Sequence, residues 1–373
     1  MTKITIACII GTRPEGIKMA PVILALRQQP WARVVVVLTA QHRELADEVL
    51  ALFDIAPDHD LNLMQPNQTL TALTARAITG LDGVMEQLRP DLVMAQGDTP
   101  TVMVSALVCF YRRIPFLHVE AGLRSHDLQS PFPEEFNRVV AGRLAQLHFA
   151  PTETACRQLL SEGVADDTVV MTGNTVIDAL YQVAAMDLPL NYALDPTRRL
   201  ILVTVHRREN FGEPIDNICR AFLHLVDANP DVELMWPVHP NPNVTRAAYG
   251  LLSGHSRIHL VPPLRYSEFV TAMKRATLIL SDSGGVQEEA PALAKPVLVL
   301  RRETERPDAI EAGVARLIGT EYDAIVREAQ NLLDDPDLYR SMAKGISPYG
   351  DGHASGRIVE AIRSRYLANE RQD

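Results

Sequence analysis

The sequence predicts an α/β protein with two domains, each built on a parallel sheet. Short runs of strand-forming residues alternate with amphipathic stretches of helical length, and this rhythm is typical of parallel sheets covered by helices. The alternation is interrupted once, by a proline-containing stretch at residues 187–199, and then restarts. The 373 residues of the chain also exceed what one ordinary domain core accommodates. We therefore expect two α/β domains.

The first half of the chain supplies one sheet. Helical stretches fill most of the gaps between its strands, and a helix at residues 176–186 precedes the proline-containing stretch. We place the first domain at residues 1–186 and a linker at residues 187–199. The expected strands cover residues 4–10, 34–39, 92–96, 115–119, 148–150 and 169–172.

The second half repeats the pattern and forms a domain at residues 200–354. Helices such as those at residues 215–229 and 322–334 separate its strands. A last amphipathic helix at residues 355–366 opens a C-terminal segment that we place at residues 355–373. The expected strands cover residues 200–205, 232–236, 258–261, 278–280 and 297–300.

Composition and charge exclude several classes of protein. Hydrophobic residues make up 47% of the chain and charged residues 22%, which is ordinary for a soluble globular protein. The N-terminus does not resemble a signal peptide, and no apolar run approaches the roughly 20 residues of a membrane-spanning helix. The formal net charge of −10 argues against a nucleic-acid partner. Four scattered cysteines indicate buried thiols, so we expect a cytoplasmic protein without a membrane or nucleic-acid partner.

The first expected strand ends in a turn that offers cationic side chains. Residues 11–18, GTRPEGIK, approach the spacing of a phosphate-binding P-loop but lack its GK[ST] ending, and no GxGxxG motif is present. A nicotinamide cofactor is therefore disfavoured. Arg13 and Lys18 could pair with phosphate, and the alternative is a surface turn with a solvated helix start.

Three acidic residues follow the ends of neighbouring strands or open the next helix. Asp98 and Glu120 each follow a strand, and Glu134 lies at the start of a helix. Asp98 could instead cap a helix, and Glu134 could simply complement a helix dipole. If the three carboxylates share one site, mutual repulsion should keep at least one protonated, which would provide an acid and a base together.

The second half places a histidine and a glycine-rich turn at equivalent strand ends. His206 follows the strand at residues 200–205, and His239 follows the next one, where a plain turn is the alternative. Residues 281–289, SDSGGVQEE, form a turn that opens a helix, and such a turn suits an anion. A glutamate one helical turn further along would suit the hydroxyl groups of a ribose. Arg306 adds positive charge. Neither histidine has the spacing of a zinc site, so we expect no metal.

These segments together resemble the non-hydrolysing UDP-N-acetylglucosamine 2-epimerases. The resemblance extends over about residues 5–360, with the blocks in the same order and spacing. It implies a GT-B-type architecture, in which two Rossmann-like domains face a central cleft and the last helix packs back on the N-terminal domain. It also implies a homodimer and no cofactor. The blocks are GTRPEGIKMAP, QGDTPT, HVEAGLRS, PFPEEFNR, TGNTVIDAL, HRRENFG, SDSGGVQEEAP and RRETERPDAIEAG.

The resemblance also implies roles for individual residues. Some members bind a second, activating substrate molecule, and in this chain Glu44 and Asn67 replace a glutamine and an arginine expected there. Gln41, Arg207 and His239 match that second site. The expected catalytic set is Asp98, Glu120, Glu134 and His206. The residues expected to hold UDP are Arg13, Lys18, Phe269, Ser283, Gly284, Gly285, Glu289 and Arg306.

The expected activity is reversible inversion of C2 in UDP-N-acetylglucosamine, giving UDP-N-acetylmannosamine. Members of the family are thought to eliminate UDP, hold a 2-acetamidoglucal intermediate, and add UDP back. Three alternatives stay open at this point: a GT-B glycosyltransferase, a hydrolysing epimerase, and a nucleotide-sugar sensor without catalysis. The sugar could also be a relative such as a 2,3-diacetamido uronate.

Overall fold

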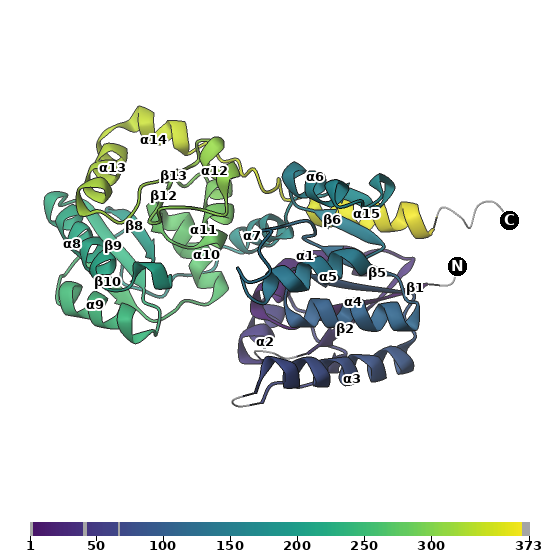
Figure 1. The fold of residues 1–373 in the computed structure, drawn as a ribbon. Helices are drawn as coiled ribbons and strands as arrows, with labels where there is room; N and C mark the ends of the chain where they lie inside the picture. The colour runs from purple at the N-terminus through teal and green to yellow at the C-terminus, as the bar shows by residue number, and fades with distance from the viewer. Residues whose placement is uncertain (1–2, 40–42, 66–67, 368–373) are drawn as a thin grey trace. The chain divides into compact units, whose positions relative to one another are not determined.

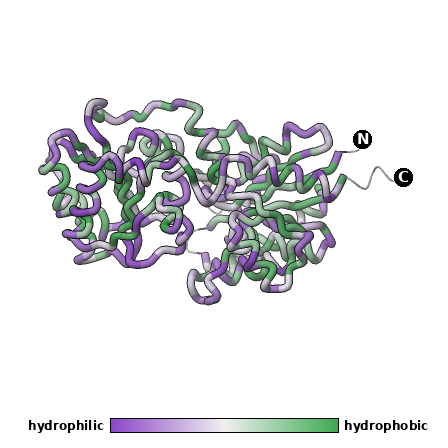
Figure 2. The backbone as a smooth tube through the Cα atoms, turned by 90° about the horizontal axis from the view of Figure 1, so that it is seen from above, coloured by the Kyte–Doolittle hydropathy of each residue, from purple (hydrophilic) through white to green (hydrophobic). Residues whose placement is uncertain are grey.

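The computed structural model describes residues 3–39, 43–65 and 68–367, and these residues form two compact units (Figure 1). The first unit combines Met1–Ala179 with Gly350–Asp373, and the second is Leu180–Tyr349. Apolar segments run through the interior of each unit, and hydrophilic segments gather at the periphery (Figure 2). Each unit therefore has its own core.

The first unit is a doubly wound α/β sheet. Among the described residues, seven parallel strands take the order β3-β2-β1-β4-β5-β6-β7. The strands are β1 (Ile4–Ile10), β2 (Ala32–Leu38), β3 (His59–Asp60), β4 (Leu92–Gln96), β5 (Phe116–Val119), β6 (Leu147–Ala150) and β7 (Val169–Met171). The helices are α1 (Arg13–Arg27), α2 (Arg43–Leu52), α3 (Leu70–Leu88), α4 (Pro100–Arg112), α5 (Glu134–Leu144), α6 (Glu153–Ser161), the 3₁₀ turn η1 (Asp166–Thr168), the start of α7 (Thr175–Ala185), and α15 (Ala354–Tyr366).

The second unit has the same plan with fewer strands. Its described residues form six parallel strands in the order β10-β9-β8-β11-β12-β13. The strands are β8 (Arg199–Thr204), β9 (Val232–Pro237), β10 (Ile258–Val261), β11 (Ala276–Ser281), β12 (Val297–Val299) and β13 (Ala315–Leu317). The helices are α8 (Glu213–Ala228), α9 (Pro242–Leu252), α10 (Tyr266–Arg275), α11 (Gly284–Glu289), α12 (Pro307–Glu311), α13 (Tyr322–Asp334) and α14 (Pro336–Met342), with 3₁₀ turns η2 (Arg208–Asn210) and η3 (Ala290–Leu293).

The central strands are buried on both faces, which explains why they read as continuous apolar runs. Residues 6–10 of β1 and residues 200–203 of β8 have no exposed surface. Helices on both faces of a parallel sheet require such strands. In the second core, the Phe222 ring meets the edge of Trp236 at a centroid distance of 5.8 Å. The expected α/β class is confirmed, and the short edge strands β3 and β13 were not predicted.

The stretch at residues 187–199, which we expected to link two domains, is bonded to the second unit. Thr271 Oγ1 donates to the carbonyl of Leu188 at 3.1 Å, and Arg275 Nη2 donates to the carbonyl of Asp195 at 2.6 Å. The backbone N–H of Asp195 donates to the buried carboxylate of Glu233 at 3.2 Å. The division between the two units falls inside α7, between residues 179 and 180.

Helix α15 belongs to the first unit although it lies at the other end of the sequence (Figure 1). It packs against α1, and its buried face includes Ile358 and Ile362. The buried carboxylate of Asp178 accepts the backbone N–H groups of Ala354 and Ser355 at 3.1 and 2.8 Å, and so satisfies the first turn of the helix. Within the described part of the chain, no helix is both long and apolar enough to cross a membrane.

Because Ile358 has no exposed surface, its truncation should destabilise the first unit. We expect Ile358→Ala to lower the free energy of unfolding by about 2–5 kcal/mol, through lost apolar burial and the cavity left behind. Urea unfolding followed by circular dichroism measures this loss. The matched control is Arg363→Ala on the exposed face of α15, expected within about 0.5 kcal/mol of the parent. Equal losses in the two variants would contradict the docking of α15 through this face.

Candidate functional site

In each sheet the strand order reverses between two central strands, β1 and β4 in the first unit and β8 and β11 in the second. At such a point the loops leaving the carboxyl ends of the strands diverge to opposite faces and leave room for a ligand. The motifs singled out in the sequence follow these strands.

The turn after β1 is held by a buried carboxylate. Glu15 Oε2 accepts the backbone N–H groups of Gly11 and Thr12 at 2.5 and 3.0 Å, and Thr99 Oγ1 donates to its Oε1 at 2.5 Å. A side chain on Gly11 would meet the hydroxyl of Thr101 at 2.3 Å, so only glycine fits there. Glu15 thus connects the loops that follow β1 and β4.

The carboxyl group of Glu15 titrates near neutral pH. Burial raises its pKa to about 7, although the hydrogen bonds from Thr99, Gly11 and Thr12 act in the opposite direction. The charge of Asp98 raises the pKa further. Glu15 was not predicted as a site residue, because the cations Arg13 and Lys18 are the more conspicuous feature of residues 11–18.

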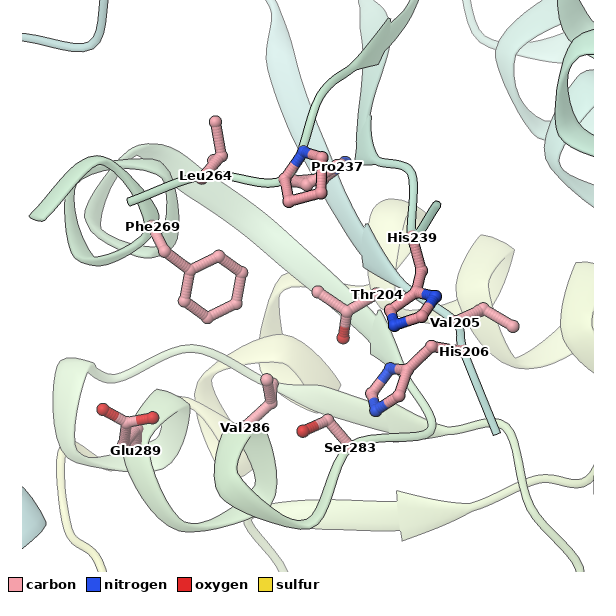
Figure 3. Close-up of a pocket in the computed structure, with 11 residues that line it drawn as sticks. Thr204, Val205, His206, Pro237, His239, Leu264, Phe269, Ser283, Val286 and Glu289 are labelled. Carbon is pink, nitrogen blue, oxygen red and sulfur yellow. The ribbon is translucent and has the colours of Figure 1, made fainter. Parts of the chain in front are cut away.

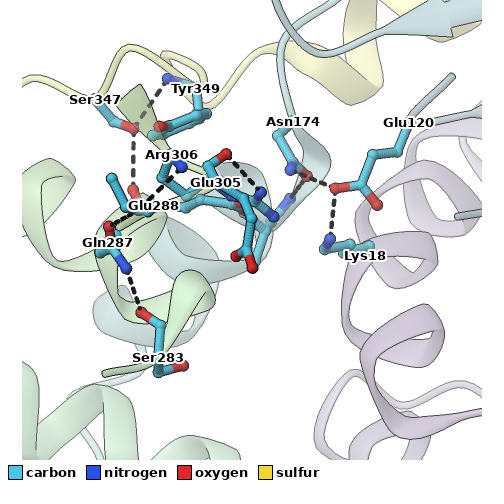
Figure 4. A network of polar contacts seen from close by, with 12 residues as sticks. Lys18, Glu120, Asn174, Ser283, Gln287, Glu288, Glu305, Arg306, Ser347 and Tyr349 are labelled. Atoms are coloured by element: carbon cyan, nitrogen blue, oxygen red, sulfur yellow. Dashed lines mark hydrogen bonds and ion pairs between the residues drawn. The ribbon is translucent and has the colours of Figure 1, made fainter. Parts of the chain in front are cut away.

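Glu120 follows β5 in a left-handed conformation, with φ of +60°. Its side chain is only 6% exposed and is surrounded by donors (Figure 4). Lys18 Nζ lies 2.6 Å from Oε1, Asn174 Nδ2 donates to the same oxygen at 2.8 Å, and Gln96 Nε2 donates to Oε2. The structure therefore brings together Lys18 and Glu120, which the sequence analysis assigned to different roles, and adds Asn174 from the TGNTVIDAL block.

A buried histidine lies in the strand before Glu120. His118 Nε2 lies 2.7 Å from the carbonyl oxygen of Gly97, and burial lowers the pKa of His118 to about 4. The ring is therefore neutral at physiological pH and fixes the Gly97 backbone. This contact helps to orient the loop that carries Asp98.

Asp98 does not cap α4, since Thr99 is the N-cap residue and Pro100 is the first residue of the helix. Its carboxylate forms an ion pair with Arg138, and Asn137 Nδ2 donates to its backbone carbonyl at 2.8 Å. The capping alternative is thus replaced by a contact with α5. Arg138 lies in the block PFPEEFNR, but its ion pair with Asp98 was not predicted.

Glu134 opens α5 and is partly exposed. It lies one helical turn before Arg138, so both side chains are on the same face of α5. The neighbouring Glu135 is buried and accepts the backbone N–H groups of Ser125 and His126, each at 3.0 Å. Glu135 is therefore a structural residue that holds the loop before α5, whereas Glu134 is available to a ligand.

The second unit has a pocket of about 220 Å³ at the carboxyl ends of β8 and β9 and beside α11 (Figure 3). One end is formed by Phe269 and Glu289, and the other by His206, His239 and Ser283. The predicted residues Phe269, Ser283, Glu289, His206 and His239 thus line one pocket. Its lining residues are Thr204, Val205, His206, Pro237, His239, Pro263, Leu264, Phe269, Ser283, Val286 and Glu289.

His206 stacks on His239 at this pocket, with ring centroids 5.8 Å apart and an angle of 20° between the planes. Burial lowers the pKa of His206, the nearby carboxylate of Asp282 opposes this effect, and His239 and Arg207 reinforce it. His239 Nδ1 accepts the backbone N–H of Asn241 at 3.2 Å. The two rings therefore form one wall of the pocket.

The glycine-rich turn begins α11, with Ser283 as N-cap residue and Gly284 and Gly285 as the first helical residues. Free N–H groups at a helix start suit an anion. Glu289 is nearly buried at the far end of this helix, and Tyr266 donates to its Oε1 at 2.7 Å. Arg306 forms an ion pair with Glu288 beside this turn (Figure 4). Tyr266 was missed in the sequence because nothing in its own segment marks the contact.

The structure describes only some of the remaining predicted residues. Arg13 is the first residue of α1 and is partly exposed. Of the second-site residues, Arg207 lies beside the Gly284 turn, whereas Gln41 and Asn67 lie outside the described residues. Over the described ranges, no group of three His, Cys, Asp or Glu side chains is arranged to hold a metal ion.

Comparison with known proteins gives one consistent result. The family model for UDP-N-acetylglucosamine 2-epimerase matches residues 24–363. The chain is 48% identical over 370 residues to the UDP-N-acetylglucosamine 2-epimerase of Escherichia coli K12, covering 96% of this chain and 98% of the relative. The crystal structure of the Neisseria meningitidis UDP-GlcNAc 2-epimerase bound to UDP-GlcNAc superposes with a TM-score of 0.88 at 45% identity, covering 97% of this chain and 100% of that one.

A more distant likeness concerns the fold alone. The glycotransferase of kitacinnamycin superposes with a TM-score of 0.60 at 12% identity, over 97% of this chain and 100% of that chain. Together with the epimerase structure, it confirms the expected GT-B class with two Rossmann-like domains.

The raised pKa of Glu15 predicts a specific pH dependence of stability. The folded protein keeps this carboxyl protonated up to about pH 7, whereas the unfolded chain ionises near the ordinary value of 4.5. Between these values the folded state binds more protons, so the free energy of unfolding falls as the pH rises. Glu15→Gln removes this titration. We expect the stability of Glu15→Gln relative to the parent to rise by roughly 1–3 kcal/mol across that window.

Urea unfolding at a series of pH values measures this difference. The control is Glu153→Gln, whose parent side chain is 76% exposed and whose curve should run parallel to that of the parent. A constant difference between Glu15→Gln and the parent from pH 4.5 to 7 would contradict the titration of Glu15 in the folded state.

Proposed function

Because the chain belongs to the UDP-N-acetylglucosamine 2-epimerase family, we propose that it interconverts UDP-N-acetylglucosamine and UDP-N-acetylmannosamine by eliminating UDP and adding it back. The enzyme is an isomerase that acts on a nucleotide sugar. The structural observation that best supports the finer mechanism is the Glu120 carboxylate, buried at a strand end and bonded to Lys18, Asn174 and Gln96.

We assign binding of the UDP moiety to the second unit. The Phe269 ring offers a flat apolar surface for a base, and Glu289, oriented by Tyr266, suits ribose hydroxyls. The N–H groups of Gly284 and Gly285 at the start of α11, together with the hydroxyl of the N-cap residue Ser283, then suit the diphosphate. Arg306, beside this turn, can bind the leaving phosphate through two N–H groups of its guanidinium. Arg13 of the first unit is the second arginine that we assign to phosphate binding.

We assign the proton chemistry to the carboxylates of the first unit. The C2 proton has no adjacent carbonyl to acidify it, so a carboxylate of ordinary basicity cannot remove it unaided. The C1–O bond must therefore stretch first, and positive charge grows at C1. Asp98, Glu120 and Glu134 stabilise that charge, and one of them takes the proton to leave a 2-acetamidoglucal. Re-addition of UDP after protonation on the other face gives the inverted sugar.

The proposed mechanism gives a role to the ion pair between Lys18 and Glu120. Lys18 stabilises the negative charge of Glu120, so this group enters the reaction as a carboxylate. His206 lies in the pocket assigned to UDP and can interact with the departing diphosphate. No external cofactor is needed, because the reaction neither oxidises nor reduces the sugar.

The assembly and the surroundings of the enzyme are also proposed. We expect a homodimer, working in the cytoplasm, where the free thiols of Cys8, Cys109, Cys156 and Cys219 would stay reduced. Arg207 and His239 stay the predicted contacts of a second, activating substrate molecule. We expect no nucleic-acid partner, since the net charge is −10.

Proton NMR of the purified protein with UDP-N-acetylglucosamine in heavy water tests the reaction. We expect UDP-N-acetylmannosamine to appear with deuterium at C2 while the nucleotide remains attached and no cofactor is added. Free N-acetylmannosamine would indicate a hydrolysing enzyme. Unchanged C1 and C2 signals would contradict the proposed reaction.

Glu120→Gln should separate catalysis from binding. We expect kcat to fall by about 100-fold or more, because the amide cannot accept a proton, while calorimetry shows that UDP binding survives. Glu86→Gln is the control, since the parent side chain is 71% exposed on α3 and its removal should leave both quantities unchanged. Near-normal turnover of Glu120→Gln would remove Glu120 from the mechanism.

A further inference from the structure

Asp282 is a charged residue with no exposed surface, and it is adjacent to Ser283 and bonded to His206, which both line the pocket of the second unit. It follows β11, between Ser281 and Ser283, at the point where the strand order reverses. Its Oδ2 accepts the backbone N–H groups of His206 and Arg207 at 2.9 and 2.8 Å and the side chain of Asn210 at 3.0 Å. One carboxylate oxygen is therefore fully occupied in holding the loop after β8.

The second oxygen of Asp282 is differently placed. Oδ1 accepts no hydrogen bond from the described residues, although it is buried. Its nearest ionisable neighbour is His206 Nδ1, at 3.2 Å. A buried carboxylate oxygen without a donor is costly, and a proton on Nδ1 of His206 would supply a donor at this distance. The free oxygen and the histidine nitrogen thus form an incomplete pair.

We propose that Asp282 is a positioning residue that holds His206 as the Nδ1–H tautomer, so that Nε2 is the proton-accepting nitrogen presented to the ligand. A carboxylate can only accept hydrogen bonds, and the nitrogen that faces it must therefore carry a proton. The other ring nitrogen then keeps its lone pair in the neutral ring. The same logic operates wherever a buried aspartate sets the tautomer of a catalytic histidine.

The charges around the ring are consistent with this assignment. Asp282 faces His206 from the turn after β11, His239 stacks on it from the loop after β9, and Arg207 is its neighbour on the loop after β8. Burial together with His239 and Arg207 lowers the pKa of His206, and the carboxylate of Asp282 acts in the opposite direction. When Nε2 takes up a proton from solvent as the anionic ligand binds, Asp282 is in place to stabilise the imidazolium. The Nε2–H can then donate to the departing diphosphate, and the proton returns to solvent when UDP leaves.

This inference rests on the proposed function only for the role of His206 in turnover, since the tautomer belongs to the ligand-free protein. Long-range ¹⁵N–¹H spectra of the full chain, labelled at the histidine nitrogens and recorded without ligand at about pH 8, report the tautomer directly. The signals of His206 are identified by their absence in His206→Gln. We expect a protonated Nδ1 and a bare Nε2.

Asp282→Asn tests whether Asp282 sets the tautomer of His206. The amide oxygen can still accept the backbone N–H groups, and its NH₂ group then faces Nδ1, so we expect the tautomer to invert. In the epimerase assay we expect kcat to fall by about tenfold or more, with a smaller change in KM and a shifted pH profile. Asp227→Asn is the matched control, because Asp227 also pairs with a histidine, His255 at 3.0 Å, but 60% of its side chain is exposed and neither residue lines the pocket.

Three results would overturn the proposal: a proton on Nε2 of His206 in the parent protein, an unchanged tautomer in Asp282→Asn, or an inverted tautomer with undiminished kcat. If Asp282→Asn does not fold, the spectrum of the parent protein still decides the tautomer. If the parent protein shows the Nδ1–H tautomer but does not turn over UDP-N-acetylglucosamine, the proposed function fails and the role of Asp282 in setting the tautomer stands.

Discussion

Buried carboxylates that accept main-chain N–H groups hold the loops on which the site depends. Glu15 holds the turn after β1, Glu135 the loop before α5, Asp282 the loop after β8, and Asp178 the start of α15. Burial removes hydration from a carboxyl group, which raises the pKa of Glu15, and the hydrogen bonds that such a group accepts offset part of that cost. Each of these carboxylates therefore accepts at least two main-chain donors, and removal of its carboxyl group would leave those donors unsatisfied.

Two of these residues occupy equivalent places in the two units. Glu15 connects the loops that follow β1 and β4, and Asp282 connects those that follow β8 and β11. Both pairs of strands mark the reversal of strand order. At this point the loops have no neighbouring strand to pair with, so a side chain has to supply the acceptors that a sheet would provide. The ligand-facing residues, such as Lys18 and His206, project from loops fixed in this way.

Sequence patterns were sufficient for the class of fold and for most strands, because buried parallel strands are apolar on both faces and are punctuated by turns. They also placed Glu120, His206 and Ser283 at strand ends. They did not reveal Glu15, Arg138 or Asp282, whose partners Thr99, Asp98 and His206 lie 84, 40 and 76 residues away in the chain. Such roles depend on which loops the fold brings together, and no local period or composition records that.

The return of α15 to the first unit has a consequence for biosynthesis. The second unit is contiguous in sequence, whereas the first unit needs a helix that is translated after the whole second unit has been made. Domains generally fold as they emerge from the ribosome, so the first unit has to wait with the α15 side of α1 uncovered. A nascent chain of this protein can therefore complete its second unit before its first, the reverse of their order in the sequence, because the first unit stays without α15 until the end of synthesis.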